Sequence, residues 1–177
     1  RAAGLSAQII APLADISASY QVILRPNCGI ILPGDLAGRR VGIARGSLVE
    51  IALRNMAKDF DLDAAEIRLL DAAPPQLLEW FANGEIDALA CWEPWTTQAC
   101  YMGGIRYFSG LYSSIPGHEG AVNWLTAHSL FVTLEAHIRD RAETLLTLLR
   151  SLEQATTYLN ATMHRAAAVF SDLLGTE

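Results

Sequence analysis

With 177 residues, 51% of them hydrophobic and 18% charged, the chain has the composition of a globular protein, which excludes a disordered one. Its length allows one sizeable core or two small lobes. The formal net charge of −6 argues against nucleic acid as a partner, because nucleic-acid binders normally carry a basic stripe.

Strands and helices alternate through the first two thirds of the chain, with short connections between them. The predicted strands cover residues 20–24, 40–44, 67–70, 86–91 and 105–108. The predicted helices cover residues 48–59, 74–83 and 94–100. Pro74 and Pro75 suit the first turn of the second helix, and Gly84 suits its end. This alternation is typical of a parallel sheet covered by helices.

The pattern changes after Gly110. A loop with two glycines and a proline covers residues 111–120, and an extended, apolar-rich segment follows within residues 121–133. From Glu135 the apolar residues recur at helical spacing, and a last helix is predicted from about His164 to Leu174. These C-terminal helices must pack elsewhere than on the first α/β unit.

The junction Gly46-Ser47, between a predicted strand and a predicted helix, has two interpretations. The free N–H groups and the partial positive charge of a helix N-terminus can bind an anion, with Arg45 beside it as a further contact or as a surface residue. Alternatively, Ser47 and Glu50 form a capping box, in which each side chain bonds the backbone N–H of the other residue. The two roles are compatible, because one capped N–H leaves others free.

Trp92 and Glu93 follow the strand over residues 86–91, at the end where open α/β sheets bind ligands. Trp92 can wall a pocket there, and Glu93 can receive a ligand ammonium or hydroxyl group. The alternative is that Trp92 and Trp95 belong to the core and that Glu93 caps the following helix, with Pro94 at its first position.

His118 and Asn123 lie in and after the glycine-bearing loop and can line a cleft between lobes, although a loop histidine is commonly just solvated. No second histidine lies at ligand spacing, so neither a metal site nor a cofactor is predicted. No nucleophile motif or phosphate loop occurs, and we predict no catalytic residue. The three cysteines, at positions 28, 91 and 100, form no CxxC pair and argue against a disulfide framework.

Two stretches, GDLAGRRVGIARGS and PPQLLEWFANGEIDALACWEPW, carry a family likeness. They resemble the solute-binding proteins of bacterial ABC importers, above all the subgroup that binds nitrate, alkanesulfonates, taurine or thiamine precursors. That subgroup has a segment with DL, G, VG and GS leading into its second lobe, and later a G-(E/Q)-(I/V)-DA strand that ends in W-(E/D)-P. The matching residues here are Asp35-Leu36, Gly38, Val41-Gly42, Gly46-Ser47, the run from Gly84 to Ala88, and Trp92-Glu93-Pro94.

The resemblance implies an α/β protein of the type II periplasmic-binding-protein fold, with one complete three-layer lobe and the C-terminal part of a second lobe. We expect residues 1–24 to form the end of the first lobe and a crossing strand. Residues 25–120 would form a second lobe of parallel α/β type, and residues 121–177 the return crossing and helices that pack on the first lobe. The resemblance also implies that the N-terminal part of the first lobe is absent from this chain. Either that part is disordered, cleaved or on another chain, or a partner chain or oligomer is expected to cover the leftover apolar surface.

The implied function is binding of a small anionic or zwitterionic solute, such as a sulfonate, taurine or nitrate, in an interlobe cleft. Gly46, Ser47, Trp92 and Glu93 would hold the solute, and an ABC permease would receive it. The implied location is periplasmic or extracytoplasmic, although no signal peptide is visible at Arg1. The alternatives are a ligand-sensing domain of a signalling protein and an enzyme of thiamine- or menaquinone-type metabolism on the same fold. We expect a binding protein and not an enzyme.

Overall fold

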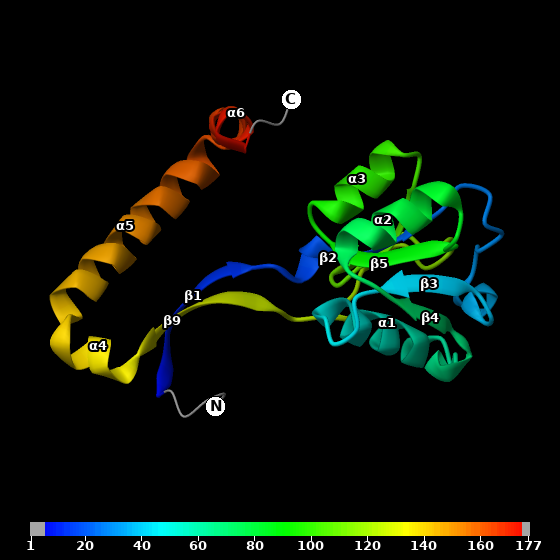
Figure 1. Ribbon diagram of the computed structural model, residues 1–177, viewed down its shortest axis with the longest axis horizontal. Coiled ribbons are helices and arrows are strands. Elements are labelled where there is room, and N and C mark those ends of the chain that lie inside the picture. Colours follow the sequence, from blue (N-terminus) through cyan, green and yellow to red (C-terminus); the bar gives the residue numbers. More distant parts are fainter. Residues whose placement is uncertain (1–5, 175–177) are drawn as a thin grey trace. The chain divides into compact units, whose positions relative to one another are not determined.

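The computed structural model describes residues 6–174, and its contacts group into two compact units (Figure 1). Unit 2 is Pro12–Leu130, and unit 1 combines the chain up to Ala11 with the chain from Phe131 on. The division predicted at residues 24/25 and 120/121 stays a prediction. Within the described residues, no helix has both the length and the apolar character of a membrane span.

Unit 2 is built on a seven-stranded sheet with the order β4-β3-β5-β2-β6-β7-β8. Its strands are β2 (Tyr20–Leu24), β3 (Arg40–Ile43), β4 (Arg68–Asp71), β5 (Ala88–Trp92), β6 (Ile105–Ser109), β7 (Tyr112–Ser113) and β8 (Gly120–Ala121). The short strands β7 and β8 lie within and directly after the segment predicted as a loop. The five longer strands agree with the predicted ones to within two residues at each end.

The prediction of a parallel sheet is only partly right. Strand β3 pairs in parallel with both β4 and β5, but β2 lies between β5 and β6 and is antiparallel to both. β2 enters the sheet before the first strand–helix–strand repeat, so its direction is not set by a helical crossover. Val22 and Ile23 are fully buried, which suits a strand covered on both faces.

Helices cover both faces of this sheet (Figure 1). They are α1 (Leu48–Asp59), α2 (Pro74–Asn83) and α3 (Trp95–Tyr101), with the short 3₁₀ turns η1 (Ser17–Ser19), η2 (Pro33–Leu36) and η3 (Ala64–Glu66). α1 buries Val49, Leu53 and Met56 in one core cluster, whereas α2 buries Leu77 and Phe81 in another. The result is the expected three-layer α/β arrangement.

The side chains of the central strands alternate between these two clusters. Val22 and Leu24 of β2 belong to the cluster under α1, and Ile23 belongs to the cluster under α2 and α3. Ala88 and Leu89 of β5 separate in the same way. This two-residue period is what a strand buried between two helical layers requires.

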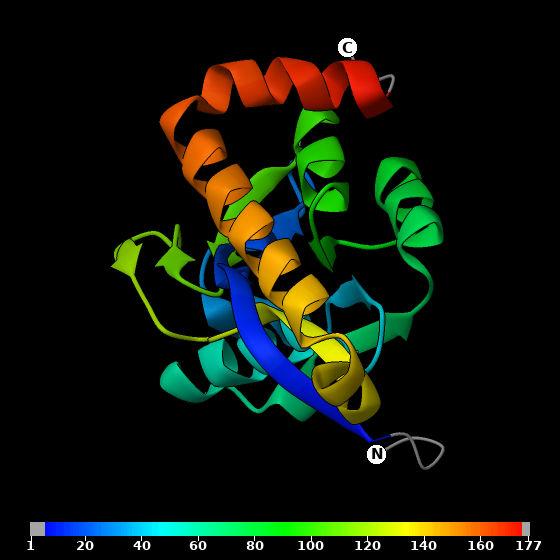
Figure 2. The same cartoon turned by 90° about the vertical axis from the view of Figure 1, so that its left-hand side faces the viewer.

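Unit 1 contains the helices α4 (Glu135–Asp140), α5 (Ala142–Ala161) and α6 (Met163–Leu174). The predicted run of helix from Glu135 is interrupted at Arg141, and the chain turns sharply between α5 and α6 (Figure 2). No side chain of α5 is fully buried; its apolar stripe, which includes Leu145, Leu149 and Leu152, is half-buried.

Strands β1 (Ala7–Asp15) and β9 (His128–Leu134) form a two-stranded sheet that continues from one unit into the other. The sequence analysis assigned no strand to residues 7–15, where Pro12 interrupts the pattern. Proline is tolerated in an edge strand, and both strands of such a sheet are edges.

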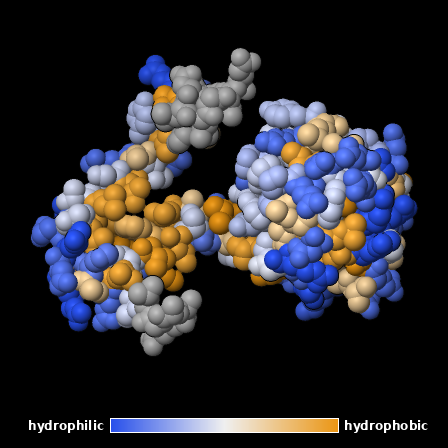
Figure 3. Space-filling view, in the orientation of Figure 1, coloured by the Kyte–Doolittle hydropathy of each residue, from blue (hydrophilic) through white to orange (hydrophobic). Residues whose placement is uncertain are grey.

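Large hydrophobic side chains remain exposed in unit 1, as Figure 3 shows. They are Ile9, Val132, Ile138, Leu146, Leu148, Tyr158, Met163 and Val169. Exposed apolar surface of this kind is consistent with the expected cover by further protein, but the partner chain or oligomer itself stays a prediction.

Candidate functional site

The carboxyl ends of β3 and β5 bring the two main predicted site segments to one edge of the sheet. The strands pair in parallel, with Ile43 opposite Ala90, so Gly46-Ser47 and Trp92-Glu93 both emerge at that edge. β2 begins there too, because Tyr20 pairs with Trp92. In open α/β sheets this edge is where ligands bind.

The turn before α1 is built around a glycine in the left-handed region. Gly46 has a φ of 77°, a conformation that side chains other than glycine rarely adopt. Ser47 then takes an extended conformation and becomes the N-cap residue of α1. Four residues, Ala44 to Ser47, separate β3 from α1, and the first N–H groups of α1 have no partner within the helix.

The predicted capping box is wrong. The Ser47 side chain accepts no N–H from the helix, and the backbone N–H of Glu50 bonds the Ser47 carbonyl at 3.2 Å. Oε2 of Glu50 accepts the N–H of Gly46 instead, also at 3.2 Å. Its other oxygen accepts from Arg54 at 2.7 Å, and this ion pair draws the carboxylate along the helix surface.

Three polar groups at this turn have no protein partner among residues 6–174. The Ser47 hydroxyl oxygen is buried without a hydrogen bond, and the N–H groups of Leu48 and Val49 have no acceptor. Buried polar atoms without partners are rare in folded proteins, and each one calls for an explanation. Together with the positive end of a 12-residue helix, these donors suit an anion.

Of the charged side chains around the turn, Glu50 and Arg54 form an ion pair and Arg45 does not. The hydrogen bond from Arg54, followed by that from the Gly46 N–H, lowers the pKa of Glu50, which keeps this carboxylate ionised. Arg45 is exposed; its backbone N–H donates to Oδ1 of Asp71 at 2.9 Å, and its guanidinium forms no ion pair within the described residues. The guanidinium of Arg45 therefore remains available to an incoming anion.

Glu93 occupies the neighbouring strand end, but both of its carboxylate oxygens already have internal donors. Oε1 accepts from the side-chain amide of Gln21 at 2.8 Å, and Oε2 accepts the backbone N–H of Thr97 at 3.0 Å. The Gln21 amide oxygen in turn accepts from Nε of Arg106. These bonds connect β2, β5, β6 and the first turn of α3, so they favour the structural alternative for Glu93.

Trp92 is half-buried, and its ring lies 6.1 Å from that of Tyr20, measured between centroids. Trp95 is also half-buried, and both tryptophans pack against the core cluster under α2 and α3. Trp92 therefore has one face against the core and leaves part of its surface at the sheet edge. A role for Trp92 in ligand binding stays a prediction.

The structure does not bring His118 to Gly46-Ser47. The exposed His118 ring lies edge-on to Phe60, with centroids 4.9 Å apart, and Phe60 directly follows α1. Ser47 lies at the other end of this 12-residue helix, about 18 Å away at 1.5 Å per residue. Asn123 is exposed, and its Oδ1 accepts the hydroxyl of Thr126 at 2.9 Å.

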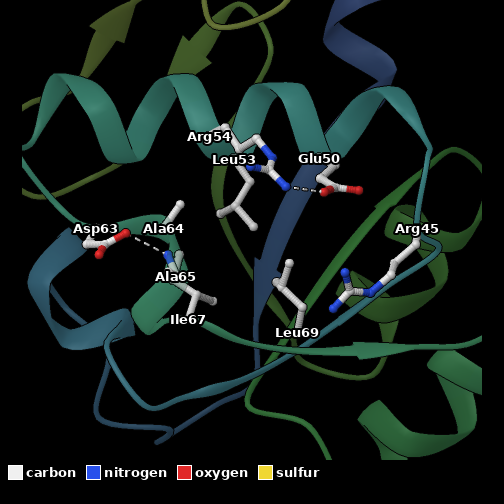
Figure 4. A pocket seen from close by; sticks show the side chains of 9 residues that line it. All are labelled: Arg45, Glu50, Leu53, Arg54, Asp63, Ala64, Ala65, Ile67 and Leu69. Carbon is white, nitrogen blue, oxygen red and sulfur yellow. Dashed lines mark hydrogen bonds and ion pairs between the residues drawn. The ribbon is translucent and has the colours of Figure 1, made fainter.

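A cavity that the sequence analysis missed lies on the flank of unit 2 beside this turn (Figure 4). Its volume is about 340 Å³, and it lies between α1 on one side and η3 and β4 on the other. Arg45 and Glu50 line it as well as flanking the turn. The only sequence signal was the charged pattern of Arg45, Glu50 and Arg54, which by itself is typical of a solvated helix face.

The sequence matches the protein family described as NMT1/THI5 like over residues 1–166. The chain belongs to this family. The comparison with curated proteins finds no match. The family membership confirms the resemblance inferred from the two sequence stretches.

Solved structures share the fold of this NMT1/THI5-like chain. The periplasmic aliphatic sulphonate binding protein SsuA from Escherichia coli matches with a TM-score of 0.78 at 16% identity. The alkanesulfonate-binding protein SsuA from Xanthomonas axonopodis pv. citri, bound to MOPS, matches with a TM-score of 0.75 at 16% identity. Both matches cover 99% of this chain but only 57% of the relative, so the chain spans little more than half of their length. The expected α/β fold class is confirmed.

The same fold is found in an enzyme. The desulfurization enzyme DSZB matches with a TM-score of 0.66 at 13% identity, over 99% of this chain and 62% of that one.

In this NMT1/THI5-like chain, burial raises the pKa of the Cys91 thiol to about 11, so it is protonated at neutral pH. Within the described residues, no group of three or more His, Cys, Asp or Glu side chains is placed to hold a metal ion.

Proposed function

We propose that this chain binds a small organic anion of the sulfonate class at the Gly46-Ser47 turn, as part of a solute-binding protein for ABC-type import. The observation that carries the proposal is the buried, unpartnered hydroxyl of Ser47 beside the free N–H groups of Leu48 and Val49. A ligand oxygen would satisfy donors that the protein leaves without a partner.

The chemistry of the turn supports a singly charged, multi-oxygen head group. A sulfonate offers three acceptor oxygens, which suit the two N–H groups and one hydroxyl at the start of this helix. The carboxylate of Glu50 accepts the Gly46 N–H and would repel a second negative charge on the ligand. Arg54 is already paired with Glu50, so it is not available to balance that second charge. Taurine presents the same singly charged sulfonate group beside an ammonium group, and nitrate carries a single negative charge, so both remain candidate ligands.

The relatives support the rest of the proposal. The two SsuA proteins are described as binding aliphatic sulphonate and alkanesulfonate, and the first is described as periplasmic. By analogy, we propose an extracytoplasmic location and an ABC permease as the partner of the whole protein. The role first suggested for Glu93, as acceptor of a ligand ammonium, has less support, since both of its oxygens are engaged.

Isothermal titration of the full chain with ethanesulfonate, taurine and nitrate tests the proposal. We expect saturable binding of ethanesulfonate, and about tenfold weaker binding after Ser47→Ala, the effect of losing one hydrogen bond. The matched control is Ser151→Ala, because the Ser151 hydroxyl bonds only the Thr147 carbonyl on the exposed surface of α5. If Ser47→Ala bound ethanesulfonate as tightly as the unmodified chain, or if no anion bound at all, the proposal would be refuted.

A stability measurement separates this role from a capping role. Since Ser47 makes no capping hydrogen bond, Ser47→Ala should change the free energy of unfolding by less than about 0.5 kcal/mol. A loss of about 1 kcal/mol, which is typical for an N-cap, would indicate a structural serine.

A further inference from the structure

The geometry points to a second ligand site on unit 2, distinct from the Gly46-Ser47 turn. We assign it to the cavity between α1 and β4, called the flank cavity from here on, and its ligand class is a short-chain alkyl monocarboxylate. Arg45 lies beside both sites, but neither Ser47 nor the N–H groups of Leu48 and Val49 line the cavity, so this site would exist whether or not the turn binds a sulfonate.

The floor of the flank cavity is apolar. Leu53 and Ile67 are almost fully buried, and Leu69 of β4 is half-buried beside them. In Figure 4 the side chain of Leu53 comes from α1 above, and those of Ile67, directly before β4, and Leu69 come from below. A volume of about 340 Å³ lies within the range of sites that hold small molecules, and an alkyl chain is what such a floor would stabilise.

Arg45 supplies a positive charge at one end of the cavity, near the carboxylate of Glu50. Glu50 forms its ion pair with Arg54 at 2.7 Å, and the guanidinium of Arg45 forms no ion pair among the described residues. Figure 4 shows Arg45 reaching over the cavity toward Leu69. A guanidinium presents two parallel N–H groups that match the two oxygens of a planar carboxylate.

The opposite end of the cavity is negative. Asp63 lies there, and one of its oxygens accepts the N–H of Ala65 at 2.9 Å, which caps η3 (Figure 4). Because this carboxyl group lines the cavity, a second carboxylate on the ligand would be repelled there. The arrangement therefore selects a molecule with one anionic head at Arg45 and an apolar tail, and it rejects a dicarboxylate.

Methyl-detected NMR of the full chain, titrated with hexanoate, adipate and hexan-1-ol, tests this assignment. We expect saturable shifts of the Leu53, Ile67 and Leu69 methyl signals with hexanoate, and binding at least about tenfold weaker with adipate or hexan-1-ol. Absence of saturable shifts at these methyl groups would overturn the assignment, and so would equal affinity for hexanoate and either of the other two probes.

Variants locate the site. Arg45→Gln should weaken hexanoate binding about tenfold by removing the charged donor, and Ala65→Leu should weaken it by filling the cavity from an exposed wall position. Arg68→Gln is the matched control, since Arg68 is exposed on β4 but does not line the cavity. Ser47→Ala should leave hexanoate binding unchanged. Hexanoate shifts that survive Arg45→Gln but vanish with Ser47→Ala would place the anion at the turn and refute the second site.

Discussion

Asp87 holds two strands of unit 2 together through one buried carboxylate, and its removal is the sharpest stability test that the structure offers. Oδ2 accepts the backbone N–H of Arg40 at 3.0 Å and its Nε at 3.1 Å, while Oδ1 accepts Nη2 at 2.6 Å. Asp87 itself is only 8% exposed. The perturbation is Asp87→Asn, which keeps the shape of the side chain but removes its charge and one acceptor oxygen.

The expected loss in the free energy of unfolding follows from the hydrogen bonds that this substitution changes. Hydrogen bonds to a charged group contribute about 1.5–3 kcal/mol, and the amide of asparagine turns one acceptor into a donor that faces the Arg40 guanidinium. Because Arg40 is partly exposed, water compensates part of the loss. We therefore expect Asp87→Asn to lower the free energy of unfolding by about 2 kcal/mol at pH 7.

The pH dependence has a definite sign. The hydrogen bonds from Arg40 are the main cause that lowers the pKa of Asp87 in the folded chain. The carboxylate therefore contributes stability above its unfolded pKa of about 3.9, and this contribution is lost as the pH falls through the lower, folded pKa. The difference between the unmodified chain and Asp87→Asn should shrink as the pH falls below about 4.

Urea unfolding followed by tryptophan fluorescence measures this difference. The four tryptophans, Trp80, Trp92, Trp95 and Trp124, all lie in unit 2 and report on its unfolding. Asp61→Asn is the matched control, because Asp61 is exposed and its φ of 52° suits asparagine. A loss below about 0.5 kcal/mol for Asp87→Asn, no greater than that of Asp61→Asn, would refute the reasoning.

Two further predictions concern the core of unit 2. Gly110→Ala should lower the melting temperature, because a Cβ atom there would lie 2.5 Å from the Ser17 carbonyl oxygen, whereas Gly34→Ala, with nothing within 4 Å, should not; equal melting temperatures would contradict this. Iodoacetamide at pH 8 should leave Cys91 unmodified in the folded chain, since burial raises its pKa to about 11, and should label the half-buried Cys100 faster. Mass spectrometry of tryptic peptides measures both thiols, and rapid labelling of Cys91 would show that β5 is open to solvent.

The elements of unit 2 were predictable where strong local signals bound them. Pro74 and Gly84 delimit α2, and Gly84 indeed ends the helix in the left-handed conformation, with a φ of 75°. The antiparallel insertion of β2 was not predictable in the same way. It depends on pairing with β5 and β6, far along the chain, and local hydrophobic periodicity carries no information on strand order.

The candidate site, like the fold, was predictable from the sequence only in part. That Gly46-Ser47 and Trp92-Glu93 share one sheet edge follows from two parallel strands, which the sequence pattern predicts. The donors that occupy Glu93 do not follow from the sequence, because Gln21 lies 72 residues away and reaches Glu93 only through the unexpected position of β2. Side-chain partners across a sheet are a consequence of topology, and the topology was only partly predicted.

The failed capping box bears directly on what the turn can bind. The S-x-x-E pattern predicts that Glu50 bonds the N–H of Ser47, but Glu50 reaches one residue further, to Gly46. In the same turn the Ser47 hydroxyl accepts no helix N–H. Arg54 stabilises the shifted carboxylate, and both residues also line the flank cavity. A pattern that ordinarily forms a capping box therefore forms none here, and the Ser47 hydroxyl joins the first two N–H groups of α1 as a donor without a protein partner among the described residues.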